Sequence, residues 1–244
     1  MRCSFFLFLI LLAATARAAV SPSGTLVIGR LPCADNAFPR AHGARQLLWE
    51  LMKRTSIEAE LESIAIDPSA ASMFRTPLLV WSCTGPIAPL SEGAIAHLRQ
   101  FLMVGGFLFV DDPAAQPGGP FDLSIRSLLT KLFPDRPLAE LSFDHVLFKT
   151  FFLLDQVAGR KLAKNRYEGI SLEDRLVVLY SGNDLMGATS RDLFGNWESL
   201  CEPGGEPQRE LSFRLGINIV MYALCLDYKN DRVHLPFILK RRRL

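Results

Sequence analysis

The chain has 244 residues, of which 49% are hydrophobic and 21% are charged, and these proportions suit one globular domain and exclude an intrinsically disordered protein. Its 27 basic and 25 acidic residues nearly balance, so the composition gives no sign of a nucleic-acid-binding surface. The G-x-G-x-x-G and P-loop patterns are absent, which excludes nucleotide binding by those two routes.

The first residues predict a cleaved export signal. Arg2 gives a basic start, residues 5–12 form an unbroken apolar run, and residues 16–18, Ala-Arg-Ala, are a small-x-small cleavage site. The run is shorter than the roughly 20 residues that span a bilayer. We therefore expect a signal peptide of residues 1–18, cleavage after Ala18, and no transmembrane segment in the mature chain. These features predict an exported, periplasmic protein.

The rest of the chain alternates between strand-like and helix-like segments. Apolar runs rich in β-branched residues predict strands at residues 25–30, 60–66, 78–83, 107–110 and 175–181. Apolar residues at helical spacing predict helices at residues 44–55, 91–104, 121–133 and 208–226. Residues 138–169 are apolar without a clear period, so we expect short extended pieces there, crossing one edge of the sheet.

Strands separated by helices, with central strands that are almost wholly apolar, are typical of a parallel sheet covered on both faces. The predicted fold is a single-domain, doubly wound α/β structure spanning residues 19–231, with a mostly parallel sheet and helices on both faces. Residues 232–244 are expected to form an extended basic C-terminal tail, because residues 240–243 are all basic.

Polar residues follow two of the central strands. Asp111 and Asp112 end one strand, and Asn183 and Asp184 follow another. The carboxyl ends of parallel strands share one edge of the sheet, and open α/β sheets bind ligands there. We place His145, from the irregular segment, over the same edge. The sequence thus predicts where a site would form.

These residues allow two interpretations. In the functional one, Asp111, Asp112 and His145 are candidates for acid–base catalysis, and Asp112, His145, Asn183 and Asp184 are candidates for ligand binding. In the structural one, one Asp caps the following loop, the other is solvated, and His145 is a hydrogen-bonded structural residue. Adjacent strand residues point to opposite faces, which favours the structural interpretation. No metal ligand set is predicted, and no cofactor is identified.

Four cysteines follow the predicted signal: Cys33, Cys83, Cys201 and Cys225. In an exported protein they can pair in three ways, and we expect Cys33 to pair with Cys201 because both lie in predicted loops. The sequence W-S-C-T-G around Cys83 resembles the nucleophile elbow of class I glutamine amidotransferases, but Ser82 replaces its first glycine. An inert, buried Cys83 is therefore favoured over a nucleophile.

Several segments carry a family resemblance. They are RQLLWELMKRTSIE at residues 45–58, LRQFLMVGGFLFVDD at residues 98–112, Asp144-His145, YEGI at residues 167–170, NIVMYAL at residues 218–224, and HLPFILKRRR at residues 234–243. The chain is similar to an exported bacterial family known as domain of unknown function 4159. The resemblance implies a fold like that of class I glutamine amidotransferases and the trehalose-utilisation-like group, without a dependable catalytic cysteine and without an established activity.

These observations predict an exported, non-catalytic α/β domain that binds a small-molecule ligand or a protein partner of the cell envelope, and no nucleic acid. One alternative is a metal-assisted hydrolase that uses Asp111, Asp112 and His145 at the carboxyl edge of the sheet. Another is a structural subunit of an envelope assembly that docks through residues 234–243. Fold resemblance does not decide among them, because one fold hosts many functions.

Overall fold

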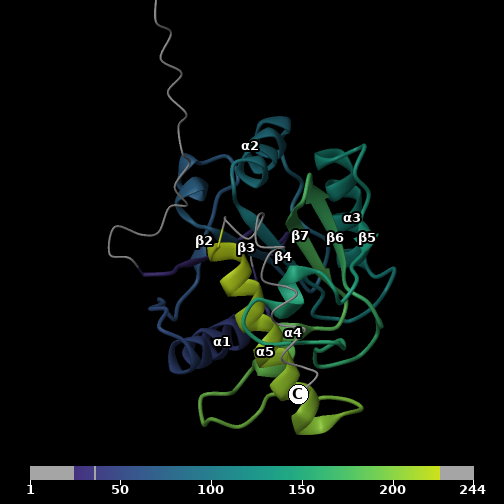
Figure 1. Ribbon diagram of the computed structural model, residues 1–244. Coiled ribbons are helices and arrows are strands. Elements are labelled where there is room, and N and C mark those ends of the chain that lie inside the picture. Colours follow the sequence, from purple (N-terminus) through teal and green to yellow (C-terminus); the bar gives the residue numbers. More distant parts are fainter. Residues whose placement is uncertain (1–24, 36, 226–244) are drawn as a thin grey trace, which may run out of the picture.

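A computed structural model describes residues 25–35 and 37–225 (Figure 1). The predicted signal peptide and the basic tail lie outside these residues, as do the outer limits of the predicted domain. The described residues form an α/β fold with one seven-stranded sheet, as predicted. None of the helices within the described ranges is long and apolar enough to cross a membrane.

The sheet is mostly parallel, with two antiparallel pairings at one side. Its strands are β1 (Ile28–Arg30), β2 (Ile64–Ala65), β3 (Leu78–Trp81), β4 (Phe107–Asp111), β5 (Ala139–Glu140), β6 (Glu168–Leu172) and β7 (Arg175–Ser181). They are ordered β2-β1-β3-β4-β7-β6-β5. The first five strands in this spatial order, from β2 to β7, run parallel to one another, whereas β6 is antiparallel to β7 and β5 is antiparallel to β6.

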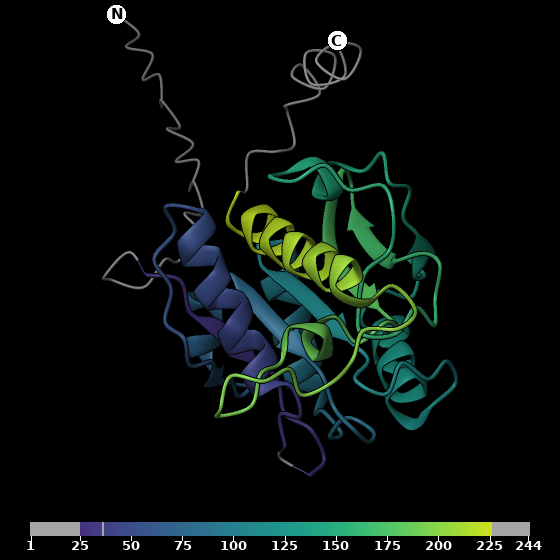
Figure 2. The same ribbon diagram turned by 90° about the horizontal axis from the view of Figure 1, so that it is seen from below.

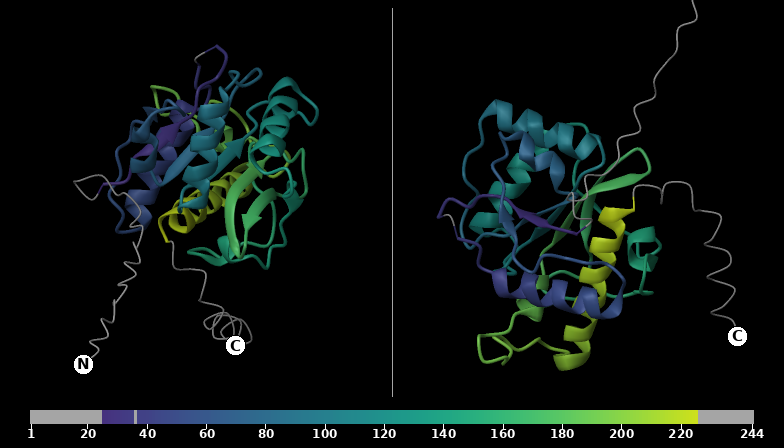
Figure 3. Two further views of the ribbon diagram at one scale, coloured as in Figure 1. Left: turned by 90° about the horizontal axis from the view of Figure 1, so that it is seen from above. Right: turned by 90° about the vertical axis from the view of Figure 1, so that its left-hand side faces the viewer.

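Helices cover both faces of this sheet. The helices are α1 (Ala41–Arg54), α2 (Glu92–Met103), α3 (Pro120–Leu132), α4 (Leu185–Thr189) and α5 (Gly205–Leu224), with short 3-10 turns at η1 (Ala71–Arg75) and η2 (Val146–Lys149). Figures 2 and 3 show α1 and α5 side by side on one face. The opposite face packs against α2 and α3.

The alternation of strand side chains produces two hydrophobic cores, one on each side of the sheet. Val80 and Phe109 enter the core shared with α1 and α5, whereas Trp81 and Val110 enter the core shared with α2 and α3. All four are at most 3% exposed. Such double burial explains why the central strands read as continuous apolar runs.

Most predicted boundaries agree with the structure to within a few residues. The strand predicted at residues 175–181 is β7, with the same bounds. Ser91 caps α2, since its side chain accepts a hydrogen bond from the Ala94 N–H. The sequence did not indicate α4 or β6. Glu168 and Gly169, which look like a turn because Gly is a common turn residue, instead begin β6.

The irregular segment crosses the carboxyl edge of the sheet in part, since the backbone of residues 160–164 is hydrogen-bonded to Asn183 and Asp184, whereas its middle packs beside α5. Leu147 and Phe148 are buried in the core shared with α5. Asn218 of α5, fully buried, accepts hydrogen bonds from the N–H groups of Phe151 and Phe152 and donates to two carbonyls of the same segment. Each buried backbone N–H and C=O group needs a hydrogen-bond partner. The Asn218 side chain supplies these partners to a segment that has no neighbouring strand to supply them.

Candidate functional site

The order of the strands marks one crevice as the expected ligand position. The chain moves outward from β1 to β2 and then returns to place β3 on the other side of β1. Doubly wound sheets bind ligands outside the carboxyl ends of the strands at such a switch point. In this protein the switch point lies between the segments that follow β1 and β3.

A disulfide joins the two segments at this switch point. Cys33, which follows β1, is bonded to Cys83, which follows β3, with their Cα atoms 5.6 Å apart. The predicted pairing of Cys33 with Cys201 is wrong, because parallel neighbours bring Cys83 beside Cys33, while Cys201 is a buried free cysteine in the loop before α5. Trp81 ties the same two segments together through a hydrogen bond from Nε1 to the Pro32 carbonyl.

The disulfide also settles the chemistry of Cys83. A disulfide sulfur has no thiolate, and Cys83 is completely buried. The residue therefore cannot act as a nucleophile in this oxidised state. The prediction of an inert, buried Cys83 agrees with the structure, although the reason is a covalent bond and not only burial.

Asp111, the last residue of β4, is completely buried beneath the start of α4. Its two carboxylate oxygens accept hydrogen bonds from the N–H groups of Leu185 and Met186 at 2.8 and 2.9 Å. Desolvation and the negative charge of Asp184 raise the pKa of Asp111 to about 7, against the lowering effect of these hydrogen bonds. The expectation that one of the two Asp residues is solvated is wrong, because Asp111 binds the unpaired N–H groups of a helix end.

Asp112 caps the loop that follows β4, as the structural interpretation predicts. Its carboxylate accepts hydrogen bonds from the N–H groups of Ala114 and Gln116 at 3.0 and 3.1 Å. The side chain is nearly buried, and desolvation raises its pKa. Asp111 and Asp112 therefore serve two different backbone segments and do not converge on a common ligand.

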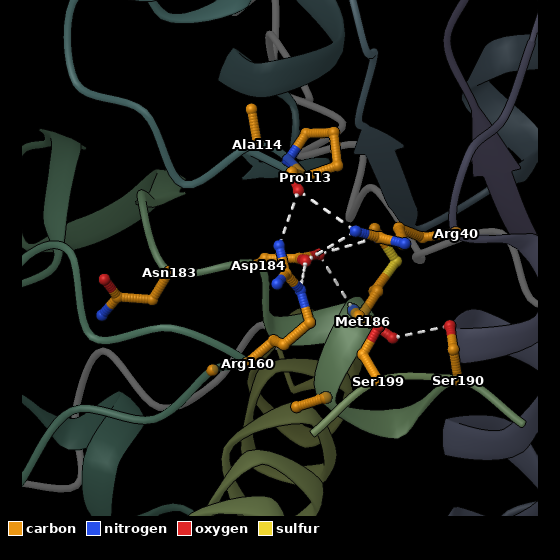
Figure 4. Close-up of polar contacts among 12 residues, drawn as sticks. Arg40, Pro113, Ala114, Arg160, Asn183, Asp184, Met186, Ser190 and Ser199 are labelled. Atoms are coloured by element: carbon orange, nitrogen blue, oxygen red, sulfur yellow. Dashed lines mark hydrogen bonds and ion pairs between the residues drawn. The ribbon is translucent and has the colours of Figure 1, made fainter. Parts of the chain in front are cut away.

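Asp184 joins three distant parts of the chain at this edge (Figure 4). Its carboxylate accepts hydrogen bonds from Nε and Nη2 of Arg40 at 2.8 and 2.7 Å. It also forms an ion pair with Nε of Arg160. Both guanidinium groups also donate to the Pro113 carbonyl. Asp184 is fully buried, whereas the Arg40 and Arg160 side chains are 18% and 16% exposed. Two cations thus share one buried carboxylate.

Asp184 also shapes the backbone at the end of β7. It has a left-handed conformation with φ of 54° and caps α4 by accepting from the Gly187 N–H. Asn and Asp adopt this conformation more readily than other non-glycine residues. The helix that it starts packs closely on α1, since a Cβ on Gly43 would lie 2.0 Å from the Met186 carbonyl oxygen. Close packing of α1 on α4 therefore requires glycine at position 43.

The remaining candidates also have structural partners. Asn183 is buried, and its amide binds both the N–H and the carbonyl of Lys164. His145 caps η2 by accepting from the Leu147 N–H, and its ring lies 5.8 Å from that of Tyr222. The Tyr222 hydroxyl binds the N–H of Leu176 at the start of β7. His145 is therefore at the opposite end of β7 from Asp184, and its expected place over the carboxyl edge is wrong.

Two arginines that no sequence pattern indicated complete this cluster. Arg40 precedes α1 and Arg160 lies in the irregular segment, 144 and 24 residues away from Asp184. No motif or spacing links them, so only the folded chain brings them together. Across residues 25–35 and 37–225, no group of three or more His, Cys, Asp or Glu side chains is arranged to hold a metal ion.

Replacing Asp111 with asparagine should change how stability depends on pH. Because the pKa of Asp111 rises from 3.8 to about 7 on folding, the folded protein binds more protons than the unfolded chain in this window. The wild type should therefore lose stability relative to Asp111→Asn as the pH rises through this window, with a constant difference above it. Urea unfolding of both proteins across this range measures the effect. The control is Asp144→Asn, which removes a carboxylate whose side chain is 90% exposed.

Comparison with known protein families matches residues 28–224 to a family described as Domain of unknown function (DUF4159). No curated protein matches the chain. The matched segment runs from the first residue of β1 to the last residue of α5, so it contains the whole sheet and the helices on both of its faces. The chain therefore belongs to the DUF4159 family.

Proposed function

We propose that this chain is an exported, non-catalytic module that acts by binding another protein. The observation that carries this proposal is at the carboxyl edge of the sheet, where the Cys33–Cys83 disulfide spans the position at which doubly wound folds bind ligands. A covalent bond at this position leaves a surface better suited to contacts between proteins than to holding a small molecule.

The polar groups at the same edge support this reading. The carboxylates of Asp111 and Asp112 bind backbone N–H groups, and that of Asp184 binds two arginines. A catalytic acid or base must come within hydrogen-bonding distance of its substrate. Buried carboxylates whose oxygens are bound by the protein itself do not meet that requirement.

The alternative, a metal-assisted hydrolase, has less support. It needs His145 beside Asp111 and Asp112, whereas His145 lies beside Tyr222, near the start of β7. The raised pKa of Asp111 would suit acid–base catalysis. However, Asp111 is completely buried, and burial beneath α4 accounts for the shift without a catalytic role.

Export is part of the proposal. The apolar start of the chain predicts a signal peptide, and a disulfide forms and persists in oxidising compartments such as the periplasm. The Cys33–Cys83 bond is what such a compartment would allow. An envelope protein is the partner class that fits this location.

A thermal-shift experiment on the mature protein tests the non-catalytic part of the proposal. Magnesium, manganese, zinc, calcium and EDTA should each leave the Tm unchanged, both in the wild type and in Asp112→Asn. A metal-dependent rise in Tm that disappears in Asp112→Asn would support the hydrolase and contradict our proposal. A bifunctional crosslinker applied to cells producing the chain should trap it in defined adducts, and recovery of the monomer alone would contradict the interaction part.

A further inference from the structure

Four basic side chains gather around the carboxyl end of β7, those of Arg40, Arg160, Lys161 and Lys164. The two arginines pair with Asp184. The two lysines belong to a segment that is held at the same place by backbone hydrogen bonds to Asn183. A Cβ on Gly182 would lie 3.0 Å from Cγ of Lys164, so this lysine lies against the end of the strand. One strand end thus collects positive charge from two distant segments of the chain.

At this end of β7 the positive charge faces the solvent and the negative charge lies beneath it. Asp111, Asp112 and Asp184, the carboxylates that follow β4 and β7, are at most 2% exposed. Each of them accepts hydrogen bonds from within the protein. By contrast, the two arginine side chains are 18% and 16% exposed, Lys161 is exposed and Lys164 is half-buried. The accessible charge at the end of β7 is therefore basic.

Several donors of these basic groups have no partner within residues 25–35 and 37–225. Neither lysine ammonium forms an ion pair there, although Glu202 lies opposite Lys161 in a short bridge. Each guanidinium donates through Nε and Nη2 to Asp184 or to the Pro113 carbonyl (Figure 4). Two Nη1 atoms and two ammonium groups can thus donate to an acceptor outside the chain.

The backbone that presents the lysines is held from beneath. The Asn183 amide, fully buried, binds the N–H and the carbonyl of Lys164. Gln208 of α5, also buried, donates from Nε2 to the carbonyls of Gly159 and Arg160. Gly159 has φ of 143°, and a Cβ there would lie 2.2 Å from the Asn183 carbonyl oxygen, so the close approach requires glycine. A segment fixed in this way loses little conformational entropy when it binds.

Oxyanions are the ligands that such a group of donors binds, because guanidinium and ammonium groups donate charge-assisted hydrogen bonds to carboxylate and phosphate oxygens. Leu162, between the two lysines in the chain, is 40% exposed. A free phosphate would leave this apolar side chain uncovered, whereas a peptide can cover it. The guanidinium groups are recessed, so a flat lipid surface would reach the lysines but not Nη1 of the arginines. An acidic protein side chain can reach both.

We propose that the carboxyl end of β7 binds an acidic segment of a partner protein through four basic residues, Arg40, Arg160, Lys161 and Lys164. The inference rests on the proposed interaction function and adds the chemistry of the partner. The lysines attract the acidic segment over a range of about 8 Å at physiological ionic strength, and the recessed arginines receive one of its carboxylates. Binding should therefore weaken as the salt concentration rises.

Fluorescence anisotropy of a labelled hexaglutamate peptide, titrated with the mature protein, tests this inference. The wild type should bind the peptide, Lys161→Gln/Lys164→Gln should weaken binding by about tenfold, and Lys161→Glu/Lys164→Glu should weaken it further. The control Arg75→Glu/Lys131→Glu makes the same change in net charge at two exposed residues elsewhere and should bind like the wild type. Each variant should unfold at the urea concentration of the wild type, which separates lost binding from lost folding.

Two further probes distinguish the sources of an oxyanion. Inorganic phosphate should displace the peptide only at concentrations that act through ionic strength, and phosphatidylglycerol vesicles should not bind the protein. Displacement by micromolar phosphate, or vesicle binding that is lost in Lys161→Glu/Lys164→Glu, would assign the site to a free anion or to a membrane and overturn the inference.

The peptide titration also has outcomes that reject the site. A wild type that does not bind the peptide would overturn the inference. So would a control variant that loses as much affinity as Lys161→Glu/Lys164→Glu, because the effect would then be one of net charge alone. If crosslinked adducts of the wild type persist in either case, the proposed interaction function stands and only its assignment to the end of β7 fails.

Discussion

Asp184→Asn is expected to lower the free energy of unfolding by about 3 kcal/mol at pH 7. The substitution removes the one carboxylate that Arg40 and Arg160 share. Breaking a buried ion pair from one side typically costs about 3–5 kcal/mol, because the partner charge stays uncompensated. We expect the lower end of this range, since both arginine side chains retain some contact with water.

Asparagine isolates the effect of charge. It tolerates the left-handed backbone at position 184, and its amide oxygen can still accept from the Gly187 N–H. Urea unfolding followed by tryptophan fluorescence measures the loss. The control Asp144→Asn breaks the ion pair of an exposed carboxylate with Lys149 and should cost less than about 1 kcal/mol. Equal stabilities of the two variants would mean that the Asp184 cluster contributes no net stability.

The second large effect is expected from the Cys33–Cys83 disulfide. It closes a loop with a sequence separation of 50 residues. In the chain-entropy model, a loop of this length removes enough freedom from the unfolded chain to contribute about 4 kcal/mol. The double variant Cys33→Ala/Cys83→Ala should therefore unfold at markedly lower urea concentration than the oxidised wild type.

Reduction provides the matched control for this prediction. Dithiothreitol should destabilise the wild type to the level of the double variant and leave the double variant unchanged. A peptide map under non-reducing conditions should recover the segments containing Cys33 and Cys83 as one linked species. Free thiols at both positions in the exported protein, or a double variant as stable as the oxidised wild type, would contradict the role assigned to this bond.

The two predictions concern neighbouring parts of one edge of the sheet. The disulfide connects the segments after β1 and β3, and Asp184 connects the start of α1 to the end of β7. Asp111 adds a further link by binding the first N–H groups of α4. The edge that holds ligands in other doubly wound folds thus serves here to fasten four strands and two helices together.

The sequence by itself determined the class of fold and most of its elements. The strands β3, β4 and β7 are continuous apolar runs, and such strands are stable only where other elements cover both faces of the sheet. The helical spacing of apolar residues before β4 predicts a helix with one face packed against the core. Local signals also predicted two caps correctly, namely Ser91 at the start of α2 and one of the paired Asp residues in the loop after β4. These features depend on residues a few positions apart, so a linear pattern contains them.

Only the tertiary structure decided which distant residues meet. The pairing of Cys33 with Cys83 follows from the placement of β3 beside β1, and the convergence of Arg40 and Arg160 on Asp184 follows from segments far apart in the chain. The position of His145 at the opposite end of β7 has the same origin. Such contacts depend on strand order and on the path of an aperiodic segment. Hydrophobic periodicity specifies the elements but not how they are arranged in space.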